Sequence, residues 1–391
     1  MFNTSTTVSK SVPRRFLSIP HRPAQQGLIK LHPHTVGVPA LAKALAAAPS
    51  STLAASAPPR ESESGAYVIR AGSAPLGVFK PTAEEMVQTS EDAAYVLGRN
   101  AEAFIGGSAG SHREVAAYLV DAAATKGGMG AGVPETTLAS AAVGRLVGGV
   151  ENGMTLGSLQ HFVENVGDVD DFGPSLFDVE DVHRIGALDV RLINCDRHGG
   201  NILVSLSKAK EAGRSHYRLT PIDHGYILPG EVKTAPWPVW MDWPQARQPF
   251  SDEMKDAILH SDVDADLEAS LQELLNAAEI ETLKYSTNLL KKGVELDMTL
   301  YEIGLLIFSR HPEEERSFLE DVLHARAESR RPFDTVKNCV FMFDEELSHE
   351  EKVSMFSSKA TPRALSRSPA AVMMEEKKSE TCHIRRHLIS I

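Results

Sequence analysis

The chain has 391 residues, of which 42% are hydrophobic and 24% charged, and this composition is typical of a globular protein large enough for two lobes. No stretch approaches the roughly 20 consecutive apolar residues that a membrane-spanning helix needs, which excludes an integral membrane protein. The net charge is −12, although residues 1–60 carry only basic charges, so the remaining body is strongly acidic and disfavours nucleic-acid binding.

Residues 1–60 are rich in Ser, Thr, Ala and Pro and contain no Asp or Glu. This composition indicates either a disordered basic leader or an organelle-targeting segment. We expect ordered structure to begin near Gly65. The three cysteines of the chain are too few and too scattered for a disulfide framework or a zinc site, which favours a reducing, cytoplasmic location.

The next part of the chain alternates short apolar runs with turn residues. Two strands are predicted at 66–69 and 76–79, separated by a Gly-Ser-Ala-Pro turn at 72–75. A helix is predicted over 113–124, followed by a Gly-rich loop at 127–132.

A clear amphipathic stripe follows, because Val179, Val182, Ile185, Leu188 and Leu192 recur at helical spacing. A polar loop at 194–200 leads from this helix into a predicted β-hairpin. The strands of that hairpin are predicted at 202–206 and 217–222, and further helices at 254–260, 267–277, 279–290 and 300–308.

A β-rich first half therefore precedes a mainly helical second half. The predicted fold class is α+β, a bilobal protein-kinase-like fold with a β-rich N-lobe and a helical C-lobe. The predicted division is a leader at 1–60, the N-lobe at 61–165, the C-lobe at 166–350 and a disordered tail at 351–391.

Candidate chemistry lies at three places in this order. Lys80 ends an early strand, and Glu114 lies on the helix that follows. Asp196 precedes Asn201 by five positions in the polar loop, and Asp223 starts an Asp-His-Gly turn directly after the second hairpin strand. The Asp-x-x-x-x-Asn spacing, the Asp-x-Gly turn and the order of these residues along the chain are typical of protein kinases.

These residue types suit phosphoryl transfer, which depends on positioning the reactants and on cancelling phosphate charge. Asp196 can act as the base or orienting group for an acceptor hydroxyl. Asn201 and Asp223 can supply the oxygen ligands that Mg²⁺ prefers. Lys80, held by Glu114, can bind the nucleotide phosphates.

Each of these residue patterns alone is weak evidence for a kinase, and one rival interpretation of them remains open. The histidines at 183, 198 and 224, with Asp196 and Asp223, could serve a metal-dependent phosphohydrolase, although no pair has the spacing of ligands on one helix. The three tryptophans, Trp237, Trp240 and Trp243, either present an interfacial surface to a lipid or anchor their loop on the C-lobe.

Several longer motifs resemble the plant-type gamma class of phosphatidylinositol 4-kinases, within the phosphatidylinositol 3-/4-kinase-like superfamily. The resemblance covers about residues 65–308 and includes 77–81 (GVFKP), 113–121 (REVAAYLVD), 131–134 (AGVP), 157–160 (GSLQ), 182–185 (VHRI), 196–203 (DRHGGNIL) and 221–226 (PIDHGY).

The resemblance implies a kinase that uses ATP and Mg²⁺ and phosphorylates the inositol 4-hydroxyl of phosphatidylinositol. By matching positions, it implies that residues 160–163 form the hinge that contacts adenine, and that Gly65 belongs to a reduced phosphate loop at 63–66. The implied site comprises the catalytic residues Asp196, Lys80, Asn201 and Asp223, the nucleotide-binding residues Lys80, Glu114, Gly65, Gln160 and Val163, and the metal ligands Asn201 and Asp223.

Two alternatives use the same fold. One is a protein Ser/Thr kinase, since members resembling this group have been described as such. The other is a catalytically weak nucleotide-binding scaffold, since acids flank the short loop at 63–66 and would repel phosphate. The expected partners are ATP and either phosphatidylinositol at a membrane surface or a protein. The expected location is cytoplasmic with peripheral membrane association, or an organelle if residues 1–60 are a targeting segment.

Overall fold

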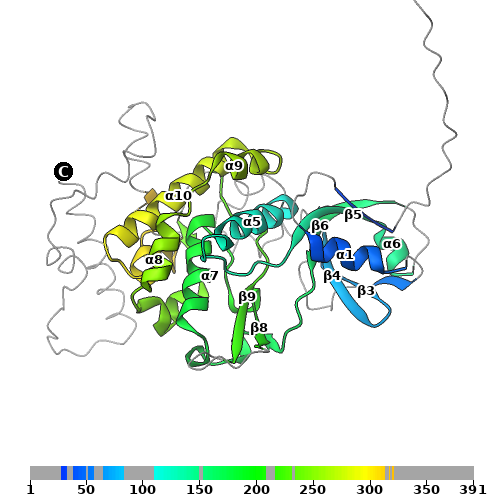
Figure 1. Ribbon diagram of the computed structural model, residues 1–391, viewed down its shortest axis with the longest axis horizontal. Coiled ribbons are helices and arrows are strands. Elements are labelled where there is room, and N and C mark those ends of the chain that lie inside the picture. Colours follow the sequence, from blue (N-terminus) through cyan, green and yellow to red (C-terminus); the bar gives the residue numbers. More distant parts are fainter. Residues whose placement is uncertain are drawn as a thin grey trace, which may run out of the picture.

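The computed structural model describes residues 28–32, 38–49, 52–56, 65–82, 110–148, 153–207, 216–230, 234–312, 317 and 319–320. Figure 1 shows two parts, a β-sheet with a short helix beside it and a larger part built mainly of helices. The observed architecture is the bilobal α+β fold that the sequence predicts. No helix among these residues is long and apolar enough to cross a bilayer.

The N-terminal part is a six-stranded sheet in which every neighbouring pair is antiparallel. The strand order is β1-β5-β6-β4-β3-β2. The predicted hairpin is confirmed as β3–β4, and Gly72 turns it with a φ of +61°, a conformation that glycine adopts without strain. The strands are β1 (Ile29–Leu31), β2 (Leu53–Ser56), β3 (Tyr67–Ala71), β4 (Ala74–Pro81), β5 (Thr136–Ala141) and β6 (Thr155–His161).

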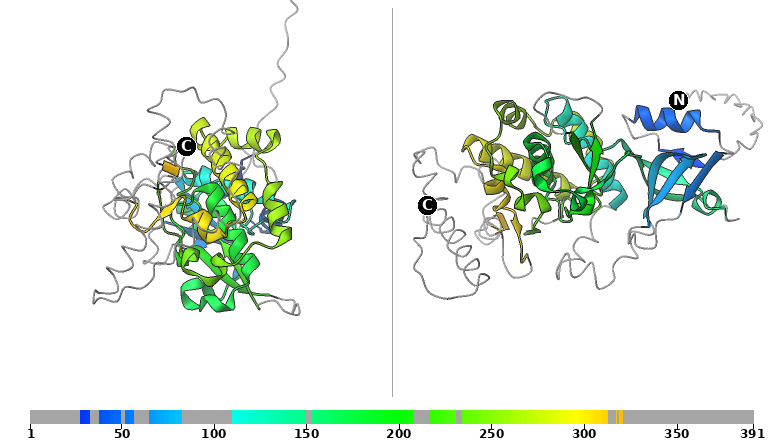
Figure 2. Two further views of the ribbon diagram at one scale, coloured as in Figure 1. Left: turned by 90° about the vertical axis from the view of Figure 1, so that its left-hand side faces the viewer. Right: turned by 90° about the horizontal axis from the view of Figure 1, so that it is seen from below.

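β1 and β2 lie before Gly65 in the chain and belong to this sheet, so the prediction that order begins near Gly65 is wrong. β1 pairs with β5 at one edge, and β2 pairs with β3 at the other. Helix α1 (Pro39–Ala47) lies over the sheet (Figure 2) and inserts Leu41, which is fully buried with Phe79 and Leu159. Burial of these side chains outweighs the low strand propensity of an Ala- and Ser-rich segment. Residues 1–27, 33–37, 50–51 and 57–60 of the predicted leader, and the predicted tail at 351–391, lie outside the described residues.

Deleting residues 1–60 should therefore abolish soluble expression or lower the melting temperature sharply, because it removes β1, α1 and β2. Deleting residues 1–27 removes none of the described elements and is the matched control. Leu41→Ala in the full chain should cost about 2–5 kcal/mol of unfolding free energy, as expected for a fully buried leucine. Thermal unfolding of the three variants checks this, and equal melting temperatures would show that α1 does not support the sheet.

The C-terminal part is built around helix α7, whose amphipathic stripe is confirmed. Ile185, Leu188 and Leu192 are buried in the main hydrophobic cluster. The other predicted helices are present with shifted ends, and α10 carries an N-terminal capping box made by Asn276 and Glu279. The helices are α7 (Val179–Leu192), α8 (Asp252–Leu259), α9 (Ala265–Gln272), α10 (Ala277–Glu295) and α11 (Leu300–Gly304).

The helix predicted over 300–308 is too long. It ends at Gly304, which packs so closely against Met241 that an added Cβ would clash with the methionine sulfur. Phe308 instead lies in β11 (Phe308–Ser309), which pairs in parallel with β10 (Ala235–Pro236). Tertiary packing against the tryptophan segment overrides the helical pattern here.

Helix α5 (Gly110–Thr125) follows the N-terminal sheet hairpin in sequence but packs into the core of the helical part. Ala116, Ala117, Val120 and Ala124 belong to the same hydrophobic cluster as α7 and α10. The predicted helix at 113–124 is thus confirmed, and its Tyr118 packs against the hydrophobic clusters of both parts of the molecule.

The second predicted hairpin is also confirmed, as β8 (Ile202–Leu206) and β9 (Tyr217–Pro221). It forms a three-stranded sheet with β7 (Gly167–Asp168). The polar connection predicted at 208–215 lies outside the described residues. This hairpin places Asn201 just before one strand and Asp223 just after the other.

Candidate active site

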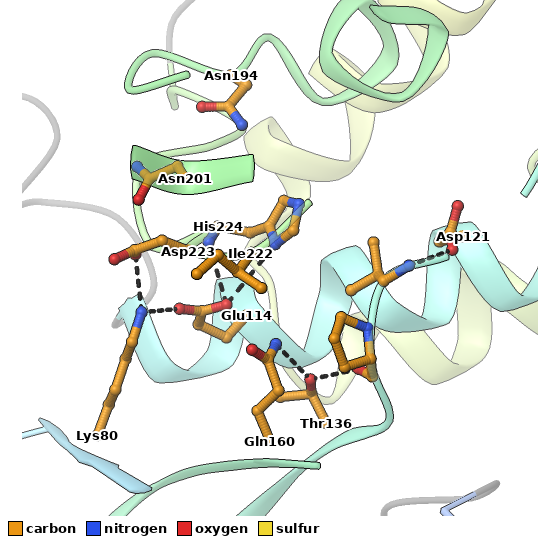
Figure 3. Close-up of polar contacts among 12 residues, drawn as sticks. Lys80, Glu114, Asp121, Thr136, Gln160, Asn194, Asn201, Ile222, Asp223 and His224 are labelled. Atoms are coloured by element: carbon orange, nitrogen blue, oxygen red, sulfur yellow. Dashed lines mark hydrogen bonds and ion pairs between the residues drawn. The ribbon is translucent and has the colours of Figure 1, made fainter. Parts of the chain in front are cut away.

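Lys80 is directed toward the helical part by the alternation of side chains along β4. Successive residues of a strand point to opposite faces, so Lys80 lies on the face opposite Phe79, which is buried beneath α1. The Lys80 Nζ lies 2.6 Å from Glu114 Oε1 and 2.9 Å from Asp223 Oδ1. Figure 3 shows the amine between these two carboxylates. Three residues from three separate elements therefore meet, as the sequence predicts.

The charges at this meeting point stabilise one another. Burial acts to lower the pKa of Lys80, but Asp223 and Glu114 outweigh it and raise that pKa above its ordinary value. Burial acts to raise the pKa of Glu114, but Lys80 and a hydrogen bond from His224 hold it well below its usual range. Lys80 stays cationic and Glu114 anionic, which is the state needed to bind phosphate.

Asp196 lies in the loop that follows α7. The helix ends with Ile193 in the left-handed conformation, at a φ of 43°, and the chain turns into residues 194–201. The Asn201 Nδ2 donates a hydrogen bond to the Asp196 carbonyl, 2.9 Å away. Burial and the nearby Asp223 carboxylate raise the pKa of Asp196 to about 6. The structure thus brings Asp196, Asn201 and Asp223 into one neighbourhood.

Asp223 has a strained backbone, with a φ of 56°. Non-glycine residues in this region are uncommon and are concentrated at functional sites. The residue before it, Ile222, donates its N–H to the Asn201 carbonyl, and the residue after it, His224, donates its N–H to Glu114 Oε2 at 3.0 Å. These two bonds fix the Asp223 turn between the hairpin and α5.

A buried carboxylate, Asp189 on α7, supports the loop from beneath. It is fully buried and accepts hydrogen bonds from the Arg197 guanidinium, from Asn194 Nδ2 and from Trp240 Nε1. Asn194 in turn accepts from the Asp196 N–H. The position of Asp196 therefore depends on Asp189, a residue that the sequence analysis missed. Its signal was an acid placed among the apolar residues of an amphipathic helix.

Arg197 ties the same loop to the Asp223 turn. Its Nη1 donates to the Asn201 and Ile222 carbonyls, at 2.5 and 2.8 Å. Its Nη2 lies 3.0 Å from His224 Nε2 and donates to it, which leaves the histidine ring proton on Nδ1. One fully buried guanidinium thus holds together both segments that carry the candidate metal ligands.

The tryptophan segment anchors the loop, as one of the two interpretations predicts. Trp240 and Trp243 are buried, and Trp240 bonds Asp189. Trp237 is only half-buried and packs edge-on against Tyr301, with Arg310 over its ring. The Val239 N–H donates to the Arg197 carbonyl, which fastens this segment to the catalytic loop.

The predicted nucleotide contacts lie at the sheet and at its ends. Gln160 is near the end of β6, and Val163 follows in the connection toward the helical part. Gly65 precedes β3 with a φ of 56°, and residues 57–64 before it lie outside the described residues. The roles of Gly65, Gln160 and Val163 in nucleotide binding stay predictions.

The side chains fit a magnesium-nucleotide. Asn201 uses its Nδ2 within the loop, so its amide oxygen remains for a metal. Asp223 uses Oδ1 with Lys80, and its second oxygen is the other candidate ligand. In the described parts of the chain no three His, Cys, Asp or Glu side chains form a metal cage. A magnesium ion in a kinase needs no such cage, because one or two protein groups, together with the substrate phosphates, complete its coordination shell.

The histidines do not gather as the phosphohydrolase interpretation requires. His183 is buried in the helical core, with its Nε2 2.9 Å from the Gln245 carbonyl and its ring against Phe250. His198 is exposed, whereas His224 is buried beside Arg197. The geometry therefore favours the nucleotide site over a histidine-liganded metal centre.

The sheet, the helical part and the Lys80–Glu114–Asp223 arrangement between them define a protein of the kinase-like fold class. The sequence profile described as "Phosphatidylinositol 3- and 4-kinase" matches residues 75–303. The chain belongs to this family, which confirms the resemblance noted from the motifs.

Individual relatives agree with this assignment. The chain is 38% identical over 291 residues to Phosphatidylinositol 4-kinase gamma 4 of Arabidopsis thaliana, an alignment that covers 70% of this chain and 50% of that protein. It is 34% identical over 287 residues to Phosphatidylinositol 4-kinase gamma 4 of Oryza sativa subsp. japonica, covering 70% and 48%. It is 39% identical over 227 residues to Phosphatidylinositol 4-kinase gamma 6 of Arabidopsis thaliana, covering 53% and 35%. The chain thus spans about half the length of the first two relatives, and less of the third.

Replacing Lys80 with methionine should weaken nucleotide binding at least about tenfold, because it removes the cation that faces the phosphates and leaves two carboxylates to repel them. Glu114, which is only 3% exposed, would also lose its partner, so the melting temperature should fall as well. Nucleotide titration and thermal unfolding measure the two effects. Lys255→Met, at an exposed pair with Asp297, is the matched control. Wild-type nucleotide affinity in Lys80→Met would contradict the assignment.

Proposed function

We propose that the protein is an ATP-dependent kinase that phosphorylates the inositol 4-hydroxyl of phosphatidylinositol at a membrane surface. The observation that carries the kinase proposal is the convergence of Lys80, Glu114 and Asp223, with Asp196 and Asn201 beside them. The acceptor is inferred from the names of the relatives and from the family that the chain belongs to.

In the proposed reaction, Lys80 binds the nucleotide phosphates and Glu114 holds its amine in place. Asp196 orients the acceptor hydroxyl and takes its proton as the new oxygen–phosphorus bond forms and the bond from the γ-phosphorus to the β-phosphate oxygen breaks. Asn201 and Asp223 would hold Mg²⁺, which when bound would supply positive charge beside the phosphates. Arg197 and Asp189 fix the relative positions of these groups.

One feature of the acceptor loop favours an unphosphorylated headgroup. Residues 226–243 contain a single basic residue, Lys233, whereas a multiply phosphorylated headgroup requires several cations. We therefore propose phosphatidylinositol itself as the acceptor. The proposed location is the cytoplasmic side of a membrane, with the chain bound peripherally.

The test uses the purified full chain, Mg²⁺ and γ-labelled ATP. It offers phosphatidylinositol vesicles in one reaction and a generic protein substrate in another. Label in lipid, with the phosphate at the 4-position, is the expected result. Label in protein alone would instead support the Ser/Thr kinase alternative, and nucleotide binding with no label in either would support the scaffold.

A further inference from the structure

The Gln160 side chain lies on the face of the sheet that carries Lys80. β4 and β6 pair in antiparallel register, with Lys80 opposite Ser158 and Val78 opposite Gln160. Paired residues of an antiparallel ladder share a face, and so do alternate residues along a strand. Leu159 points to the other face, where it packs with Leu41 beneath α1. Gln160 is therefore directed toward the nucleotide side, as Figure 3 shows beside Glu114.

Two hydrogen bonds fix the direction of its amide. Thr136 on β5 is fully buried, and its hydroxyl donates to the Pro134 carbonyl, 2.8 Å away. A hydroxyl has one proton, so toward Gln160 the Thr136 oxygen can only accept. The Gln160 Nε2 lies 3.0 Å from it and must be the donor. The carbonyl oxygen of the amide is consequently the end turned away from Thr136.

An oriented carbonyl distinguishes the two purines. Adenine carries a 6-amino group that donates hydrogen bonds, whereas guanine carries a 6-oxo group that accepts them. A hydrogen-bond acceptor on the nucleotide face, next to the hinge, attracts the 6-amino group of adenine and repels the 6-oxo group of guanine. A site with such a fixed polar group discriminates strongly, because the wrong ligand leaves it unpaired.

We propose that the Gln160 side-chain carbonyl is a specificity-determining acceptor for the adenine amino group, and that Thr136 is the positioning residue that sets its direction. This inference rests on the proposed kinase function and goes beyond the backbone contact expected of the hinge. It adds a side chain that selects ATP over GTP.

The test measures competition of magnesium-ATP and magnesium-GTP for a fluorescent nucleotide on the full-length protein. Wild type should prefer ATP. Gln160→Leu removes the acceptor and should lower the ratio of ATP to GTP affinity about tenfold or more. Thr136→Val removes the hydroxyl with little change in shape, which frees the amide to turn, and should lower the same ratio. Thr136→Ser keeps the hydroxyl and should retain the wild-type ratio.

If Thr136 had a merely structural role, its replacement would weaken the binding of ATP and of GTP equally. The readout is therefore the ratio of the two affinities and not either affinity alone. Equal ATP and GTP affinity in wild type, or an unchanged ratio in Gln160→Leu, overturns the inference while leaving the kinase proposal standing. If Gln160→Leu does not fold, the comparison of Thr136→Val with Thr136→Ser tests the inference instead. Identical ratios of ATP to GTP affinity in these two variants overturn it. Failure of wild type to bind either nucleotide would overturn the kinase proposal and the inference together.

Discussion

Replacing Asp196 with asparagine should lower kcat on phosphatidylinositol vesicles by about 1,000-fold, within the range expected when a positioned base is lost. Asparagine keeps the size of the side chain and cannot accept the hydroxyl proton. The hydrogen bond from the Asn201 Nδ2 to the backbone carbonyl of residue 196 does not involve the altered carboxylate, so the loop should stay in place. Nucleotide affinity should change by no more than about twofold, because Lys80 and Asp223 are untouched.

The two measurements are initial rates with labelled ATP and equilibrium titration with a fluorescent nucleotide. Asp256→Asn is the matched control, since it makes the same charge change at a side chain that is 78% exposed on α8. Wild-type turnover by Asp196→Asn would remove Asp196 from the mechanism. A parallel loss of nucleotide affinity would indicate that its role is in binding.

Replacing Asp189 with alanine should cost about 3–5 kcal/mol of unfolding free energy, because it leaves the buried Arg197 guanidinium without its carboxylate. Both partners of this ion pair are fully buried, so solvent cannot replace the lost contact. Trp240→Phe removes only the indole N–H that bonds Asp189 and should cost about 1–3 kcal/mol. Asp189→Asn, which keeps an acceptor, should lie between the two.

Denaturant unfolding of the three variants checks this order. Equal losses in Asp189→Ala and Trp240→Phe would show that the carboxylate does not organise the loop. Catalysis gives a second readout, because Asp189 positions Asp196 through Asn194. Asp189→Asn should therefore lower kcat more than it raises the KM for ATP.

Much of the fold could be predicted because its elements have strong local signals. Gly72 marks the first hairpin turn, and the stripe from Val179 to Leu192 marks α7. The elements at residues 29–56 have no such signal, since β1 has only three residues and β2 is rich in Ala and Ser, as a disordered leader is. They gain structure from pairing with β3 and β5 and from the packing of Leu41 against Phe79 and Leu159.

The candidate active site likewise contains residues that could be predicted from the sequence and residues that could not. Lys80, Glu114 and Asp223 could be predicted to meet because their order along the chain matches a known chemical plan, and the structure brings them together. Asp189 could not, because its importance comes from Arg197, Asn194 and Trp240 arriving from other segments. Contacts between residues distant in sequence leave no periodic pattern.

Helix α5 is bonded to the helical part near its start and to the loop that follows it near its end. Near its start, the buried Arg113 pairs with Glu279 on α10, and Glu114 accepts the His224 N–H. Near its end, Asp121 accepts backbone N–H groups from residues 131–133. Lys80, by contrast, lies on strand β4 of the sheet. The Lys80–Glu114 ion pair therefore links β4 of the sheet to α5, so any change in the angle between that strand and that helix would separate the phosphate-binding amine from its carboxylate partner.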